Sequence, residues 1–253
     1  MTEPTNSETY HGFISHLIEL RDRLMRCAVV VVVVFLCLMP FASKIFDLLA
    51  SPMMQTLPSG AKMIATGVIT PFLIPVKVTL MLAVLISLPW ILYQVWAFVA
   101  PGLYAHEKKL IAPLVVSSSA LFVAGVAFCY FFVFRVVFKF VNDFAPKSIS
   151  VSPDIESYLD FVMTMFVAFG VTFEVPIIVI VLVRMGLVPL AKLKQIRPYV
   201  IVGAFVVAAI VTPPDITSQC LLAVPMCLLY EIGLLVAPWF ERVGVAPATE
   251  NTS

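Results

Sequence analysis

Charge is scarce in this sequence. Only 12% of the 253 residues are Asp, Glu, Lys or Arg, whereas 61% are hydrophobic and the mean hydropathy is +1.05. Soluble domains carry about 25% charged residues. The net charge of +1 provides no clustered basic face, which excludes nucleic acid as a partner. This composition indicates an all-α integral membrane protein with several spans.

Motifs that carry catalytic chemistry are missing as well. The sequence contains neither H-E-x-x-H nor G-x-S-x-G, so we expect no enzyme and no metal or other cofactor. The polar N-terminal segment lacks the short basic region of a cleavable signal, and no internal repeat is visible. The cysteines form no C-x-x-C pair and fall in apolar stretches, which favours buried free thiols: Cys27, Cys37, Cys129, Cys220 and Cys227.

Six apolar stretches are candidates for membrane crossings, in a single domain over residues 1–240 followed by a short tail, 241–253. The fifth stretch has about 15 residues and spans only about 22 Å of a hydrocarbon core of about 30 Å. Six crossings place both termini on one side, and the excess of Lys and Arg on that side predicts that it is cytoplasmic. The expected spans lie near 24–46, 75–99, 110–139, 157–185, 198–212 and 217–238.

Two acids lie in segments expected at the inner face. In "HLIELRDRL" (16–24), Glu19 stands four residues before Arg23, so it either forms a helical ion pair or receives an external cation. In "YQVWAFVAPGLYAHEKKL" (93–110), Glu107 precedes two lysines that are its simplest partners. Two carboxylates on one membrane face nevertheless suit guanidinium groups, which bind carboxylates through two hydrogen bonds.

Other polar residues interrupt apolar helices or precede them. Glu174 stands inside "FGVTFEVPIIVIVLV" (169–183), where a carboxylate is costly and is a functional candidate. Asp215 precedes the sixth span as an expected N-cap, and Gln219 follows one turn later. Ser152 or Asp154 is the expected cap of the fourth span, and the proline-rich first outer loop is expected to fold into a cap.

Several of these segments together resemble the TatC family, the multispanning subunit of the twin-arginine protein translocase. The resemblance covers residues from about 12 to 240 and implies six helices in a concave, cupped arrangement, with helices five and six short. It rests on "HLIELRDRL", "ILYQVWAFVAPGLYAHEKK", "MIATGVITPF", "FGVTFEVP", "RPYVIVGAFVVAAIVTPPDITSQ" and "PMCLLYEIG", which occur in this order.

The resemblance also implies roles for individual residues. Glu19 and Glu107 match the acids that receive the paired arginines of a signal peptide, and Phe98 matches the aromatic residue near that site. Glu174 matches the polar residue of helix four that meets a partner helix; a protonated, hydrogen-bonded carboxyl is the alternative. Structural positions in the outer cap and before helix six are matched by Pro52 and Asp215, whereas Gly67 replaces an acid that is frequent in the family.

The function implied by the resemblance is export of folded proteins across the bacterial inner membrane, driven by the proton-motive force. The implied partners are the single-span subunits TatA and TatB, twin-arginine signal peptides, membrane lipid and further copies of this chain in a receptor complex. A proton-coupled solute transporter is the main rival, because it would also use membrane carboxylates such as Glu174. It would, however, require several polar groups converging at mid-membrane or repeated halves.

Overall fold

The computed structural model describes residues 6–55, 63–99, 111–144, 153–212 and 216–240. Within these ranges the chain is helical and has no strand, apart from one isolated bridge between Ile64 and Asp154. The chain divides into two compact units, Met1–Gly170 and Val171–Ser253.

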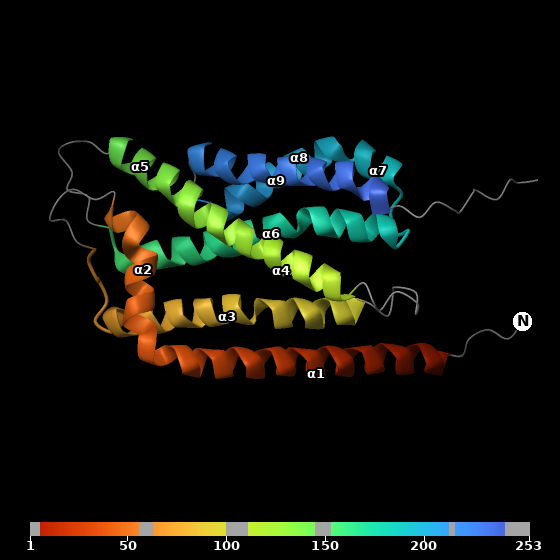
Figure 1. The fold of residues 1–253 in the computed structure, drawn as a ribbon, viewed down its shortest axis with the longest axis horizontal. Helices are drawn as coiled ribbons and strands as arrows, with labels where there is room; N and C mark the ends of the chain where they lie inside the picture. Colours follow the sequence, from red (N-terminus) through yellow and green to blue (C-terminus); the bar gives the residue numbers. More distant parts are fainter. Residues whose placement is uncertain (1–5, 56–62, 100–110, 145–152, 213–215, 241–253) are drawn as a thin grey trace, which may run out of the picture. The chain divides into compact units, whose positions relative to one another are not determined.

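The first unit holds most of the long helices. Helices α1 and α3 pack against each other along their lengths, and α2 and α4 each pack against α3 (Figure 1). The elements are α1 (Asn6–Leu38), the 3-10 turn η1 (Met39–Phe41), α2 (Ala42–Met54), α3 (Thr70–Val99), α4 (Ile111–Phe128), the π-helical turn η4 (Cys129–Val133), α5 (Phe134–Phe144) and the first part of α6 (Ile155–Arg184).

Helix α1 differs from the span predicted over 24–46. It begins at Asn6, so the segment 16–24 belongs to the same unbroken helix as the predicted span. It ends at Leu38 because Pro40 follows at the start of η1, where its ring and missing N–H disrupt a continuing α-helix. The chain then enters α2, which includes the first residues of the predicted outer loop. The loop's described residues 63–69 are irregular apart from the bridge of Ile64 to Asp154, and the folded cap stays a prediction.

Aromatic side chains fill the interior of the first unit. Phe134 is fully buried, and its ring lies 5.4 Å from that of Phe138 and 5.3 Å from that of Phe166. Phe138 in turn contacts Tyr158, with 5.6 Å between ring centroids. These contacts join α5 to the start of α6 within the unit.

The second unit packs the C-terminal part of α6 against a short hairpin. Its further elements are α7 (Leu190–Gln195), α8 (Arg197–Val211), α9 (Ile216–Val236) and the 3-10 turn η5 (Ala237–Phe240). Tyr230 donates a hydrogen bond to the carbonyl of Leu193 at 2.8 Å, and Arg197 pairs with Glu231 at 2.8 Å. The buried core comprises Val179, Val183, Leu193, Tyr230, Leu234 and Ala237.

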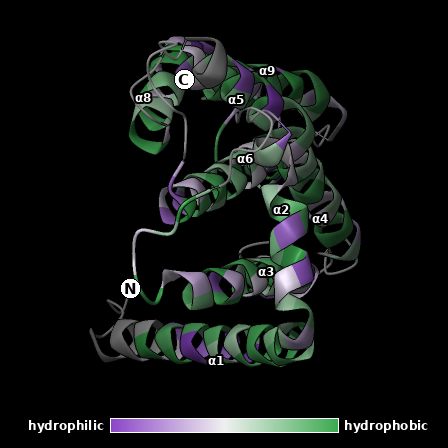
Figure 2. Cartoon of the chain, turned by 90° about the vertical axis from the view of Figure 1, so that its left-hand side faces the viewer, coloured by the Kyte–Doolittle hydropathy of each residue, from purple (hydrophilic) through white to green (hydrophobic). Residues whose placement is uncertain are grey.

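Five helical stretches among the described residues are long and apolar enough to cross a membrane. Figure 2 shows hydrophobic residues dominating the helices, with hydrophilic ones in short patches. Helix α8 is also apolar but has only 15 residues. The chain is therefore a multi-pass membrane protein, while the sixth crossing and the cytoplasmic termini stay predictions. The five stretches are Ile14–Ser51, Thr70–Phe98, Ala112–Phe140, Ile155–Arg184 and Ile216–Trp239.

Candidate functional site

A charged cluster links the N-terminal half of α1 to the C-terminal end of α3. Arg23 donates two hydrogen bonds to Oε1 of Glu19, from Nε at 3.0 Å and from Nη2 at 2.6 Å. This confirms the ion pair that the i,i+4 spacing predicted. The Glu19 side chain is still 37% exposed, so an external cation can also reach its carboxylate.

The same guanidinium is held from α3. Arg23 Nη1 donates to Oε1 of Gln94 at 3.1 Å, and Nη2 donates to the carbonyl of Ala97 at 3.2 Å. Ala97 lies in the last turn of α3, where carbonyls lack helical partners and the helix dipole attracts a cation. Sequence reasoning missed Gln94, although a glutamine inside an apolar helix was a visible signal.

An aromatic stack borders this cluster. The imidazole of His16 lies on the ring of Phe98, with 4.2 Å between centroids and an interplanar angle of 16°. Nδ1 of His16 is 3.9 Å from Oε2 of Glu19, which is too far for a hydrogen bond. A carboxylate beside an aromatic face suits a guanidinium group, which forms hydrogen bonds in its plane and stacks through its flat face.

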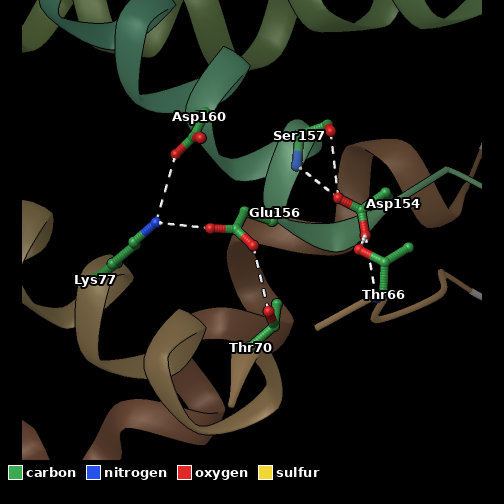
Figure 3. A network of polar contacts seen from close by, with 7 residues as sticks. All are labelled: Thr66, Thr70, Lys77, Asp154, Glu156, Ser157 and Asp160. Carbon is green, nitrogen blue, oxygen red and sulfur yellow. Dashed lines mark hydrogen bonds and ion pairs between the residues drawn. The ribbon is translucent and has the colours of Figure 1, made fainter. Parts of the chain in front are cut away.

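A second polar network lies at the start of α6 (Figure 3). Asp154 accepts the backbone N–H of Ser157 at 3.1 Å and the hydroxyl of Thr66 at 3.0 Å. It is therefore the N-cap of α6, one of the two caps that the sequence predicted. The Ser157 backbone N–H, together with the Thr66 and Ser157 hydroxyls, lowers the pKa of the Asp154 carboxyl below its ordinary value.

The same network pairs α3 with the first turns of α6. Lys77 lies between two acids, 3.4 Å from Glu156 and 3.8 Å from Asp160, as Figure 3 shows. The other oxygen of Glu156 accepts the hydroxyl of Thr70 at 3.2 Å. These contacts join the start of α3 to the start of α6. We interpret the network as structural.

The remaining candidates are spread over the chain. Pro52 lies in α2, and Gln219 donates to the carbonyl of Phe205 at 3.1 Å, which joins α9 to α8. Glu174 lies in α6 and is buried, with 8% exposed. Glu107 and Asp215 lie outside the described residues.

The cysteines and the acids give no sign of redox or metal chemistry in the part of the chain that the structure describes. All five cysteines are free, but only Cys129 is buried and Cys37 is exposed, so burial was predicted too broadly. No group of three or more His, Cys, Asp or Glu side chains among the described residues could hold a metal ion.

Comparison with known proteins settles the family. Residues 15–225 match the family model described as TatC, Sec-independent protein translocase protein. The chain belongs to the TatC family. This membership confirms the resemblance that the motifs indicated, and it indicates a role in transport and not in catalysis.

The chain aligns with individual TatC proteins over nearly its whole length. The chain is 48% identical to the Sec-independent protein translocase protein TatC of Haemophilus influenzae, over 98% of this chain and 96% of that one. It is 51% identical to the TatC protein of Escherichia coli strain K12, over 94% and 92%. The crystal structure of a twin arginine translocase receptor, TatC, aligns with a TM-score of 0.78 and 36% identity, covering 90% of this chain and all of that one.

Proposed function

We propose that this chain is the signal-recognition subunit of a twin-arginine translocase in the bacterial inner membrane. It binds twin-arginine signal peptides at the cytoplasmic face and, with TatA and TatB, exports folded proteins at the expense of the proton-motive force. Family membership supports the proposal at the level of the translocase. The geometry around Glu19 supports the assignment of the site.

The observation that carries the proposal is a half-exposed carboxylate beside a stacked aromatic pair. Oε2 of Glu19 accepts no hydrogen bond from a described residue. The imidazole of His16, which is stacked on Phe98, lies 3.9 Å from it. Two anionic acceptors suit a signal with two arginines, because each guanidinium carries a full charge at any physiological pH. Glu107, nine positions beyond Phe98, is proposed as the second acceptor.

Glu174 is proposed to act in assembly and not in signal binding. Its burial within α6 shields the carboxyl from hydrocarbon, where a charge is costly. We assign it to contact with a polar residue on a TatA or TatB helix that docks by displacing the side chains now covering the carboxyl, because at 8% exposure the carboxyl is covered in this structure. Gln219 and Pro52 are assigned structural roles in the hairpin and in α2, and Asp215 the role of a helix cap.

Site-specific photo-crosslinking of an Arg-Arg signal peptide to the full chain in membranes tests the signal site. Replacing both Glu19 and Glu107 by Ala should abolish the crosslink while the chain stays inserted. Asp22→Ala is the matched control, because Asp22 is an exposed acid on the same part of α1 and, among the described residues, pairs with its neighbour Arg21. Retained crosslinking in the double variant would sink the assignment.

A separate variant tests the role of Glu174. Glu174→Gln keeps hydrogen bonding but removes the charge, so it should leave signal crosslinking intact and weaken copurification with TatA or TatB. Near-normal export and copurification would instead favour a neutral, hydrogen-bonded carboxyl. Loss of signal crosslinking would place Glu174 in the recognition step and contradict the proposal.

A further inference from the structure

The contacts of Glu19 are divided unequally between its two oxygens. Both hydrogen bonds from Arg23 end on Oε1, at 3.0 Å and 2.6 Å. Among the described residues, Oε2 is approached by the imidazole of His16, whose Nδ1 lies 3.9 Å away, within ion-pair range when the ring is protonated but beyond hydrogen-bond distance. One half of the carboxylate is therefore committed within the chain, and the other half faces the ring stack of His16 and Phe98.

Arg23 is itself fixed from a second helix. Its Nη1 donates to Gln94 and its Nη2 to the carbonyl of Ala97, so four hydrogen bonds anchor one guanidinium. Gln94 is buried, with 4% exposed, and the Arg23 side chain is 20% exposed. A guanidinium held in this way has lost most of its rotamer freedom already, so it can orient a carboxylate at little further entropic cost.

We propose that Arg23 is the positioning residue of the arginine-binding site. It holds Oε1 of Glu19, and Oε2 thereby stays directed toward the incoming guanidinium of the signal peptide. Gln94 and Ala97 keep Arg23 in place from α3. This inference rests on the proposed function, in which Glu19 binds an arginine of the signal peptide.

An alternative role for Arg23 is that of a competitor that must leave before the signal binds. Departure would break the contacts to Gln94 and Ala97 together with those to Glu19. It would also leave the buried Gln94 oxygen without its donor, and such an unsatisfied polar group is unfavourable. The geometry points to an arginine that stays.

A double-mutant cycle tests the positioning role. The affinity of the full chain in membranes for a labelled Arg-Arg signal peptide is measured for the wild type, Glu19→Gln, Arg23→Gln and the double variant. Arg23→Gln should weaken binding about tenfold in the wild-type background and by less than about twofold when Glu19 is already Gln, because Arg23 acts through Glu19. Arg26→Gln is the control: it removes an exposed cation three residues away that contacts no described acid.

The results of this cycle distinguish a failure of the proposed function from a failure of the positioning role of Arg23. If Glu19→Gln leaves the affinity unchanged, the proposed function fails. If Glu19→Gln weakens binding but Arg23→Gln adds the same factor in both backgrounds, or raises the affinity, the positioning role is overturned while the signal site stands. Should Arg23→Gln fail to insert, Gln94→Leu replaces it in the cycle, because it removes the support of Arg23 without altering any charge.

Discussion

At the scale of single residues, Asp154 shows how one carboxylate orders the start of a membrane helix. It caps α6 through Ser157 and joins that helix to Thr66. Its pKa in the folded chain lies below the ordinary value of about 3.9. The ionised form is thus the one that stabilises the fold, in full above the unfolded pKa, and the contribution is lost as the pH falls through the lower folded pKa.

We therefore expect Asp154→Ala to unfold at a lower temperature than the wild type at pH 7, with the gap closing below about pH 4, where the wild-type carboxyl also becomes protonated. Thermal unfolding of the detergent-solubilised chain across a pH series measures this. Asp22→Ala serves as the control, since Asp22 caps no helix start. A gap that is constant over the whole series would show that the charge of Asp154 contributes nothing.

Pro52 has no backbone N–H, which affects the hydrogen bonding of a carbonyl one turn earlier in α2. In α2 it stands four residues after Leu48, so the carbonyl of Leu48 receives no helical hydrogen bond from it. The hydroxyl of Tyr130 donates to that carbonyl at 2.8 Å. A side chain from η4 thus replaces the bond that the proline removes.

Tyr130→Phe should therefore destabilise the chain by about 1–3 kcal/mol, since it leaves a carbonyl unsatisfied. Tyr158→Phe is the comparison, with a buried hydroxyl where that of Tyr130 is exposed. Tyr158 donates to the next carbonyl, that of Leu49, at 2.9 Å, and this carbonyl keeps its helical donor, so we expect a smaller loss of about 1 kcal/mol. Denaturant unfolding in detergent gives both values, and equal losses would refute the role assigned to Pro52.

At the scale of elements, the contact between α6 and α9 depends on a glycine. A Cβ placed on Gly233 would lie 3.0 Å from Cα of Pro176 and 3.1 Å from Cβ of Val179. Neither atom is the end of a flexible side chain, so the helices would have to move apart. Small residues allow such close backbone approach between membrane helices.

Gly233→Ala should cost about 1–3 kcal/mol of stability by overpacking this contact. Gly203 in α8 provides the control, because a Cβ there meets no atom within 4 Å. Gly203→Ala should be neutral or stabilise by up to about 1 kcal/mol through helix propensity. Thermal unfolding compares the two variants directly. Equal unfolding temperatures would mean that the contact between α6 and α9 has room for the added methyl group.

The elements also show where sequence reasoning succeeds and where it stops. Apolar runs predicted the helices, because burial in a bilayer imposes a length that composition reveals. The break at Pro40, the π-helical turn at Cys129–Val133 and the contact of Arg23 with Gln94 were not predicted. The first involves a proline inside an apolar run, and the contact of Arg23 with Gln94 depends on packing between segments distant in sequence.

At the scale of the whole molecule, the residues proposed for recognition come from separate stretches of sequence. Glu19 was chosen by its motif, but only the structure shows that Arg23 occupies one of its oxygens and that His16 lies against Phe98. The stack of His16 on Phe98 and the contacts of Arg23 with α3 follow from the packing of α1 on α3, which a single sequence does not specify. The family motifs indicated which residues to propose for the site, and the fold supplies the geometry around Glu19.

The number of crossings is the remaining test of the whole chain, and α8 decides it. Its 15 residues rise only about 22 Å, against a hydrocarbon core of about 30 Å. We expect both α8 and α9 to cross, in a locally thinned bilayer. If α8 stopped short, the C-terminal tail would lie on the side opposite to the N-terminus, whereas the distribution of Lys and Arg predicts both termini on the cytoplasmic side.

Single cysteines introduced at Ser7, Ser148 and Ser253 in a cysteine-free chain distinguish these topologies. A membrane-impermeant maleimide added to intact spheroplasts should label Ser148→Cys, and it should label Ser7→Cys and Ser253→Cys only after the membrane is permeabilised. Labelling of Ser253→Cys but not Ser7→Cys in intact spheroplasts would give an odd number of crossings. That result would make α8 a re-entrant helix, and it would remove the C-terminal tail from the face on which Glu19 is proposed to meet the signal.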